Sequence, residues 1–306
     1  MLIVNLQGGL GNQMFQYAFA KACEEKMKEK VFFDFNWFEA SKKAIVNDKN
    51  ETANGVVMRE YALSLFNIDV PIAPNKEIQK NKAIKSKLPG FLRKIFNVPK
   101  YKENGPTENY YCEFNPKLLS KRKSGYYSGY FQNEKYFKNI ASTIKKDFEL
   151  PDFDKKDEYN NNILTQIKNT NSIMLHIRQG DYVNLGIQIN IEYYKEAIKH
   201  IKSKIEDPTF FIFGQTTKEF IEQIFEGENL KYIIIGDTNY NNKEDWKDFK
   251  LMIECKHSII ANSSFSWWAT WLKEYEGKIT VAPTPWLHEI DKIIPDRWYK
   301  INLNKG

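Results

Sequence analysis

The most informative stretch of the sequence is residues 173–182, which read Ile-Met-Leu-His-Ile-Arg-Gln-Gly-Asp-Tyr. Its run of apolar residues predicts a short buried strand, and this strand ends by presenting His176 and Arg178. Gly180 then predicts a turn that brings Asp181 beside them. In an open α/β sheet, ligands bind just outside the carboxyl ends of the strands, so charged side chains can meet a ligand there without being buried unpaired.

Arg178 is the candidate anion receptor of this stretch. A guanidinium can grip a pyrophosphate with two parallel hydrogen bonds, and it stays charged at any working pH. We expect Asp181 to hold the guanidinium in position and His176 to offer a ring nitrogen to a ribose or a base. The alternative is an ordinary strand end with a surface Arg–Asp pair, which contributes about 0–1 kcal/mol.

The N-terminus predicts a βαβ unit. Residues 2–6 read as a buried strand, residues 14–28 as a helix and residues 31–35 as a second strand. This order predicts a parallel sheet. The loop before the helix contains Gly9 and Gly11, which let backbone N–H groups approach a ligand at the helix N-terminus, where the helix dipole favours negative charge.

One alternative function comes from the same unit. Asp34, at the end of the second strand, resembles the ribose-binding acid of a nicotinamide-binding fold. The spacing argues against that interpretation, because a Gly-x-Gly-x-x-Gly pattern would need a glycine where Met14 stands. Because Asp34 supports it and the glycine spacing does not, a nicotinamide-dependent oxidoreductase is the second hypothesis.

The rest of the chain also alternates between strands and helices. A Pro- and Asp-rich stretch near residues 150–159 predicts a linker, so we place a domain boundary after residue 150. The predicted domains are residues 1–150 and 151–306. Beyond the boundary the predicted strands are residues 173–177, 209–213, 232–235, 258–261 and 278–283. The chain is thus predicted to have an α/β fold with two Rossmann-like halves and parallel sheets.

Residues 262–266, Asn-Ser-Ser-Phe-Ser, form a turn between a predicted strand and a predicted helix. Ser263 and Ser264 bring hydroxyls and backbone N–H groups to a helix N-terminus, which suits a phosphate. A plain helix N-cap is the alternative. We expect this turn and the Arg178 turn at the carboxyl edge of the same parallel sheet, where together they can clamp one pyrophosphate.

Composition narrows the class of protein. The net charge of +6 over 306 residues favours an anionic ligand or membrane surface, and no motif that reads nucleic acid accompanies it. The three cysteines are far apart, which favours a reducing compartment, and no long apolar run predicts a membrane span. We expect a cytoplasmic protein. Residues 80–102 are basic and amphipathic, and they predict either peripheral contact with an anionic membrane or a solvated helix.

Four blocks of the sequence resemble signature blocks of the bacterial α-1,2-fucosyltransferases, glycosyltransferase family 11. They are residues 8–18 (GGLGNQMFQYA), 129–137 (GYFQNEKYF), 176–182 (HIRQGDY) and 262–268 (NSSFSWW). The resemblance runs in order from residue 1 to about the end of the chain, and the length of the blocks argues against chance similarity.

The resemblance implies a GT-B architecture, in which two Rossmann-like domains face each other across a cleft. The donor would bind in the C-terminal half and the acceptor toward the N-terminal half. The implied reaction moves L-fucose, or a close relative such as colitose, from a GDP-sugar to the 2-hydroxyl of a galactoside in surface glycan synthesis. It proceeds with inversion and without a metal or other cofactor. The expected partners are a nucleotide-sugar donor and a galactose-terminated oligosaccharide or lipid-linked glycan, and no nucleic acid.

The resemblance also implies roles for individual residues. Arg178 would neutralise the departing GDP pyrophosphate, and His176 would contact the nucleotide. Asn12, in the glycine loop, would approach the sugar or the acceptor. Phosphate would be cradled by three residues of the second turn: Ser263, Ser264 and Phe265.

The sequence departs from the family pattern at two points. The family usually has a second arginine after Arg178, where this chain has Gln179. After the strand 209–213 the family usually has Ser-Asp-Asp, whereas this chain has Gly-Gln-Thr at residues 214–216. In related fucosyltransferases an acid near that point receives the guanine edge, and Gln215 can accept a hydrogen bond only without charge. A non-catalytic nucleotide- or glycan-binding protein is therefore the third hypothesis.

Overall fold

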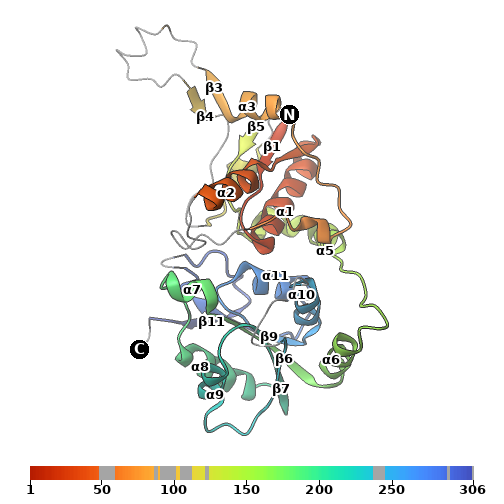
Figure 1. Ribbon diagram of the computed structural model, residues 1–306, viewed down its shortest axis with the longest axis vertical. Coiled ribbons are helices and arrows are strands. Elements are labelled where there is room, and N and C mark those ends of the chain that lie inside the picture. Colours follow the sequence, from red (N-terminus) through yellow and green to blue (C-terminus); the bar gives the residue numbers. More distant parts are fainter. Residues whose placement is uncertain are drawn as a thin grey trace. The chain divides into compact units, whose positions relative to one another are not determined.

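The computed structural model describes residues 1–47, 59–85, 89, 101–103, 112–120, 124–236, 245–287 and 290–304 (Figure 1). The chain packs into two compact units, of which the first ends at Asp147 and the second begins at Phe148. Each unit contains its own parallel sheet with helices packed on it, so the predicted α/β fold with two Rossmann-like halves is confirmed. The cleft between the halves, and the assignment of the acceptor to the first and the donor to the second, stay predictions.

The first unit is built on a three-stranded parallel sheet in the order β2-β1-β5. Strand β1 (Leu2–Asn5) pairs on one side with β2 (Val31–Asp34) and on the other with β5 (Gly125–Tyr127). Its helices among the described residues are α1 (Leu10–Met27), α2 (Asn36–Asn47), α3 (Asn75–Lys82) and α5 (Ala141–Asp147), with short 3-10 helices at Leu63–Leu65, Pro116–Leu119, Glu134–Tyr136 and Lys138–Ile140.

Helix α1 lies inside the first unit and is buried around most of its circumference. Most of its apolar side chains are buried, Phe15 and Phe19 completely, and the ring of Phe19 stacks on that of Phe131 with a centroid distance of 3.9 Å. Two buried polar residues of the helix, Gln13 and Gln16, are hydrogen-bonded to the loops around it. A helix buried on most of its surface needs hydrogen-bond partners for its buried polar side chains, because an unpaired buried amide is costly.

Part of the basic stretch 80–102 lies within the described residues. Helix α3 ends at Lys82, and strands β3 (Ala83–Lys85) and β4 (Tyr101–Glu103) form an antiparallel pair. Residues 86–88 and 90–100, on which the predicted helix or membrane contact depends, lie outside the described residues. Among the helices that the structure describes, none is both long enough and apolar enough to cross a membrane.

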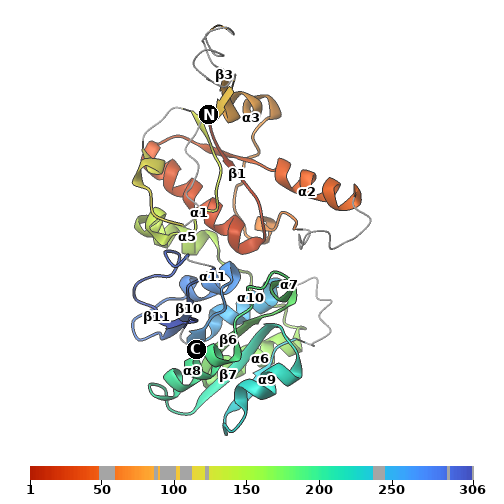
Figure 2. The ribbon, with the colours of Figure 1, turned by 90° about the vertical axis from the view of Figure 1, so that its left-hand side faces the viewer.

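The second unit is built on a six-stranded parallel sheet in the order β11-β10-β9-β6-β7-β8 (Figure 2). Its strands are β6 (Asn171–Arg178), β7 (Pro208–Gln215), β8 (Lys231–Ile234), β9 (His257–Ile259), β10 (Thr280–Thr284) and β11 (Tyr299–Asn302). Its helices are α6 (Glu158–Asn169), α7 (Gly180–Asn184), α8 (Ile191–Lys202), α9 (Lys218–Phe225), α10 (Asp245–Glu254) and α11 (Ser264–Leu272).

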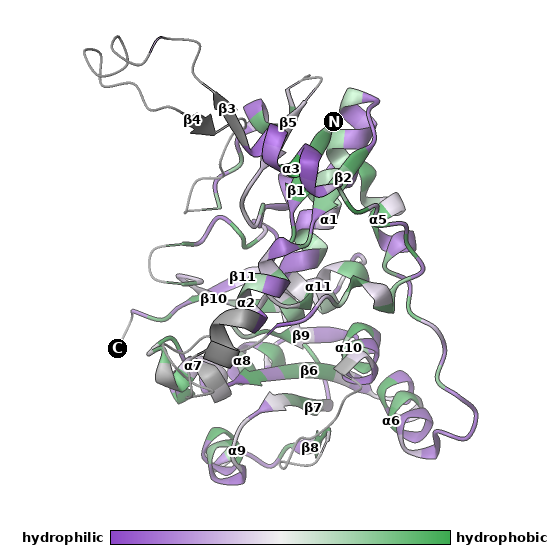
Figure 3. Ribbon diagram, turned by 45° about the horizontal axis from the view of Figure 1, so that its top comes forward, coloured by the Kyte–Doolittle hydropathy of each residue, from purple (hydrophilic) through white to green (hydrophobic). Residues whose placement is uncertain are grey.

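Strand β6 sits in the middle of this sheet and is buried on both faces. Ile173, Leu175 and Ile177 pack in one cluster with the apolar residues of α8 and α9. Met174 points to the opposite face, because successive side chains alternate, and it is fully buried as well. In Figure 3 the middle of β6 is hydrophobic, whereas the helices α6 and α9 carry both hydrophobic and hydrophilic residues. Two-sided burial is typical of parallel sheets.

Three elements differ from the sequence-based expectation. Strand β5 lies in a Gly- and Tyr-rich stretch where the sequence predicts no strand, and β11 extends the sheet beyond residues 278–283, the last predicted strand. The predicted linker ends earlier than expected, because α6 begins at Glu158 with Asp157 as its N-cap, which accepts a hydrogen bond from the backbone of Asn160.

Candidate functional site

The candidate site lies at the carboxyl edge of the second sheet. Strand β6 ends at Arg178, directly beside Gln215 at the end of β7. On its other side β6 pairs with β9, whose chain continues through Asn262 into α11. The structure thus brings most of the predicted donor-site residues to one edge of one sheet: His176, Arg178, Gln215, Ser263, Ser264 and Phe265.

The ends of β6 and β7 approach each other closely at Gly214. This glycine has φ +107°, and a Cβ atom on it would overlap with the carbonyl oxygen of Ile177 and lie 3.1 Å from Cδ2 of His176. Gly180, in the turn after β6, has φ +28°, and a Cβ atom there would overlap with the side-chain oxygen of Gln215. Gly214 needs to be glycine because the obstructing atom belongs to the backbone, whereas at Gly180 the flexible Gln215 side chain could move and the positive φ is what favours glycine.

Gln179 and Thr216, which stand at departures from the family pattern, contact each other. The hydroxyl of Thr216 donates to Oε1 of Gln179 over 2.9 Å, and the backbone N–H of Gln179 donates to the carbonyl oxygen of Gln215 over 3.0 Å. A neutral hydrogen bond thus joins the two turns here. The side chain of Gln179 is thus hydrogen-bonded to Thr216, and Arg178 is the arginine that this turn has in place of the usual two.

His176 is buried, with 4% of its surface exposed, and its Nδ1 has no hydrogen-bond partner among the described residues. Burial, followed by the positive charge of Arg178, lowers the pKa of His176 to about 3. The imidazole is therefore neutral at physiological pH. A neutral ring that keeps an unpartnered nitrogen can donate to or accept from a ligand, depending on its tautomer.

Arg178 is partly buried and lies against Tyr182 on the short helix α7. The guanidinium carbon is 5.2 Å from the centre of the Tyr182 ring, which is within range of a cation–π interaction. The Tyr182 hydroxyl in turn donates to the backbone oxygen of Asn262 over 3.3 Å. Tyr182 therefore connects the two turns that the sequence predicted to act together. Its position four residues after Arg178 is the signal that could have identified it.

The turn before α11 is not a plain helix cap. Ser263 is the N-cap residue, yet its side chain makes no capping hydrogen bond, and the first turn of α11 contains no acid. Asn262 donates from Nδ2 to the backbone oxygen of Ile187 over 2.9 Å, while its Oδ1 is buried without a partner among the described residues. Phe265 packs on Phe249 of α10, with a centroid distance of 4.7 Å. The positive end of α11 thus faces the turn without a side-chain cap, which favours an anion.

Asp181 is the predicted site residue whose role the structure leaves open. Its backbone belongs to α7, and its side chain lies outside the described part of the chain. The orientation of Arg178 by Asp181 stays a prediction.

The glycine loop of the first unit has a different construction. Gly8 has φ +78°, Gly9 is the N-cap of α1 and Gly11 is buried in its first turn. Asn12 accepts a hydrogen bond at Oδ1 from Nε2 of Gln132, over 2.8 Å. The side chain of Arg59 lies over Gly9, with Cδ 3.8 Å from where a Cβ atom would stand. The sequence identified neither Gln132 nor Arg59, because both are far from the loop along the chain.

Asp34 is a structural residue. Its Oδ1 accepts from the backbone N–H of Asn36 over 2.9 Å, and its Oδ2 accepts from the hydroxyl of Tyr126 over 2.7 Å. The carboxylate is buried, and both oxygens are engaged. Its interpretation as a ribose-binding acid is therefore wrong. The hypothesis of a nicotinamide-dependent oxidoreductase rests on the glycine loop and on Asp34, so it loses the second of these two features.

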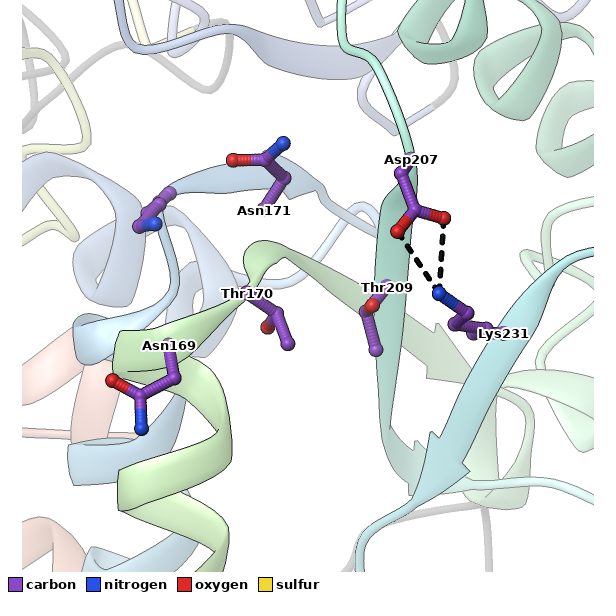
Figure 4. Close-up of a pocket in the computed structure, with 7 residues that line it drawn as sticks. Asn169, Thr170, Asn171, Asp207, Thr209 and Lys231 are labelled. Carbon is purple, nitrogen blue, oxygen red and sulfur yellow. Dashed lines mark hydrogen bonds and ion pairs between the residues drawn. The ribbon is translucent and has the colours of Figure 1, made fainter.

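A polar pocket of about 250 Å³ lies at the opposite, amino edge of the second sheet (Figure 4). It is lined by residues that begin the strands, and inside it Lys231 forms an ion pair with Asp207 at 2.9 Å. Its distance from the carboxyl edge separates it from the site above. Within the described ranges, no group of three or more His, Cys, Asp or Glu side chains is placed to hold a metal ion.

Comparison with known proteins identifies the family. The model of glycosyl transferase family 11 matches residues 1–302. An alpha-1,2-colitosyltransferase of Escherichia coli is 31% identical over 98% of this chain and 99% of its own. The O-antigen biosynthesis glycosyltransferase WbnK of Escherichia coli is 30% identical over 97% of this chain and 99% of its own. Among solved structures, the NodZ alpha-1,6-fucosyltransferase soaked with GDP-fucose has 13% identity and a TM-score of 0.45, over 89% of this chain and 92% of its own. The match over nearly the whole chain, which the four sequence blocks predict, shows that this protein belongs to glycosyl transferase family 11 and is a glycosyltransferase.

Proposed function

We propose that this glycosyltransferase transfers L-fucose, or a close relative such as colitose, from a GDP-sugar to the 2-hydroxyl of a galactoside, with inversion and without a metal ion. The observation that carries the proposal is the carboxyl edge of the second sheet. A permanently charged arginine, a buried neutral histidine with an unpartnered nitrogen and an uncapped helix N-terminus converge there. A nucleoside diphosphate has the complementary groups: two phosphates and a polar nucleoside.

The pyrophosphate is assigned to Arg178 and the N-terminus of α11. The guanidinium can donate two parallel hydrogen bonds to phosphate oxygens. From the other side, Ser263 can supply its hydroxyl and Ser264, the first residue of α11, a backbone N–H, because the backbone N–H of Ser263 already donates to Ala261. Phosphate charge grows as the sugar leaves, so these donors stabilise the transition state more than the bound substrate. The loss of one such donor typically costs about 3–4 kcal/mol of that stabilisation.

The nucleoside is assigned to His176 and Gln215. His176 is neutral, so it binds by hydrogen bonding and not by charge. Gln215 stands at the end of β7, beside Arg178, and its amide can accept from the N–H groups of a guanine edge. This amide would take the place of the acid that related enzymes use.

The names of two relatives support the identity of the sugar and the linkage. One of the bacterial proteins is an alpha-1,2-colitosyltransferase, and the other acts in O-antigen biosynthesis. Colitose and L-fucose differ only at one hydroxyl, so the same donor site can serve either. We place the reaction in the synthesis of a surface glycan on the cytoplasmic side of the membrane, with a galactose-terminated oligosaccharide or lipid-linked glycan as acceptor.

The transfer itself is a single displacement. The acceptor oxygen bonds to the anomeric carbon while the bond from that carbon to the phosphate oxygen breaks and its electron pair leaves with GDP. The proton of the acceptor hydroxyl passes to solvent water. A pyrophosphate is a good leaving group once its charge is balanced, so Arg178 carries more of the rate than a strong base does. In this scheme Asp181 orients Arg178, and Asn12 approaches the sugar or the acceptor.

A transfer assay tests the proposal. The purified protein is incubated with lactose and either GDP-L-fucose or GDP-colitose, in the presence and absence of EDTA, and the product is examined by NMR. We expect an α-linked deoxysugar on O2 of the galactose unit and the same rate in EDTA. A product linked elsewhere would refute the 2-hydroxyl, a loss of rate in EDTA would refute metal independence, and transfer from neither donor would refute the whole proposal.

A further inference from the structure

The loop that follows β5, residues 128–133, lies beside the glycine loop of the first unit. Strands β1 and β5 are parallel neighbours, so the loops after them emerge at the same carboxyl edge. Two hydrogen bonds join the loop after β5 to the first two turns of α1, which follow the glycine loop: Gln132 donates to Oδ1 of Asn12 over 2.8 Å, and Gln16 donates from Nε2 to the backbone oxygen of Gly129 over 3.1 Å. Ligands generally bind at the carboxyl edge of a parallel sheet, and here side-chain amides lie at that edge.

The backbone around Gln132 is held in an uncommon conformation. Phe131 has φ +54° and Cys112, which contacts Gln132, has φ +54° as well. Residues with a side chain rarely adopt this region, and strain of this kind persists only where the surroundings enforce it. Here the stacking of Phe131 on Phe19 enforces it, together with a 3.0 Å hydrogen bond from Nδ2 of Asn133 to the carbonyl oxygen of Cys112. The result is a Gln132 amide fixed in place beside Asn12.

The chemistry of this edge suits a neutral carbohydrate. The amides of Asn12 and Gln132 carry both donors and acceptors, as sugar hydroxyls require, and neither is charged. Tyr130, two residues before Gln132, is 40% exposed and offers an aromatic ring to the apolar face of a pyranose. Asn12 and Gln132 are partly buried and lie between buried neighbours on the chain, so each keeps part of its surface accessible.

We propose that Asn12, Gln132 and Tyr130 form a carbohydrate subsite on the first unit that binds the galactose unit of the acceptor. This inference rests on the proposed function for the identity of the sugar. It adds Gln132 and Tyr130 as residues that determine acceptor affinity, independently of the nucleotide.

Lactose binding tests the subsite. Dissociation constants of lactose are measured by NMR titration, with and without GDP, for the wild type and for the variants Gln132→Glu, Tyr130→Ala and Tyr130→Phe. Gln132→Glu keeps the size of the side chain but removes the N–H that donates to Asn12. We expect Gln132→Glu and Tyr130→Ala to weaken lactose binding about fivefold to tenfold, the effect of one lost contact of this kind. Tyr130→Phe keeps the ring, so we expect a change of about twofold at most.

The control is Gln79→Glu, which alters an exposed amide on α3 of the same unit. Binding of GDP by each variant, measured by calorimetry, reports on the fold of the second unit and should be unchanged. Lactose binding that is absent in the wild type, equal in all variants or equally weakened by Gln79→Glu would overturn the subsite. If lactose binds and responds to the variants while GDP does not bind, the subsite stands and the donor assignment falls. If GDP binds and lactose does not, the donor assignment stands and the subsite falls.

Discussion

His176 shows how much the function of one residue here depends on its surroundings. It lies on the central strand β6, where burial removes water from the ring, and two residues from Arg178, whose charge repels a second proton. Both effects keep the imidazole neutral. A neutral ring next to a permanent cation gives the site one charged and one uncharged donor, which matches a phosphate next to a nucleoside.

The depressed pKa of His176 predicts a loss of stability in mild acid. The unfolded chain takes up a proton below pH 6.5, whereas the folded chain refuses it down to about pH 3. The unfolded state thus binds more protons in this window, and the free energy of unfolding falls as the pH is lowered. From pH 7 to pH 5 we expect this residue alone to remove about 2 kcal/mol.

Urea unfolding of the wild type and of His176→Leu, at pH 7, 6 and 5, measures this effect. The variant has no group to titrate at this position, so its free energy of unfolding should fall less steeply. His257, whose pKa is lowered to about 4 chiefly by burial, remains in both proteins and acts in the same direction. Parallel pH profiles for the two proteins would show that His176 is not a neutral, buried histidine.

At the scale of elements, the ends of β6 and β7 form the rigid part of the site. Gly214 joins them so closely that a side chain would meet the backbone oxygen of Ile177. We expect Gly214→Ala to lower the free energy of unfolding by about 3 kcal/mol, through positive-φ strain together with the backbone overlap. Donor binding should weaken as well, because Arg178 and His176 stand on the displaced strand.

Gly227→Ala is the matched control for this variant. Gly227 also has a positive φ, of +75°, but a Cβ atom on it would meet nothing within 4 Å. Only the backbone strain applies there, at about 1 kcal/mol. Chemical denaturation of both variants separates the two causes. Equal losses of stability would mean that the close contact of β6 and β7 does not exist.

The elements also show what a sequence can predict. Strands β1, β6 and β7 are apolar runs bounded by turn residues, and the sequence located all of them. Strand β5 has only three residues inside a Gly- and Tyr-rich stretch, which is too short for a pattern. Helix α6 buries Ile163 and Ile167 at helical spacing, but the Asn residues at its start are typical of a loop. The contact between Asn12 and Gln132 spans 120 residues of sequence, and no local pattern could predict it. The sequence could likewise place Ser263 at a helix start, but it could not predict that its side chain makes no capping hydrogen bond.

At the scale of the whole molecule, each unit has its own parallel sheet and its own candidate binding edge. The edge of the second unit carries a permanent positive charge at Arg178 and a helix N-terminus, which suit a nucleoside diphosphate. The edge of the first unit carries the neutral amides of Asn12 and Gln132 and an exposed tyrosine, which suit a sugar, and the Arg59 side chain lies over Gly9 beside them. A transferase needs both a donor and an acceptor site, and the proposed function assigns the donor to the edge of the second unit and the acceptor to the edge of the first.

The central claim is that the second unit binds GDP through Arg178. Calorimetric titration of GDP, UDP, CDP and NAD into the metal-free protein tests it most directly, with Arg178→Ala as the test variant and Lys218→Ala as a control that removes one exposed positive charge from the same unit. Of the four ligands, we expect only GDP to bind. Arg178→Ala should weaken its binding by about tenfold to a hundredfold, since charge-assisted hydrogen bonds are lost, and Lys218→Ala should leave it nearly unchanged. Preference for another nucleotide, or equal affinity of GDP for the wild type and Arg178→Ala, would contradict the account.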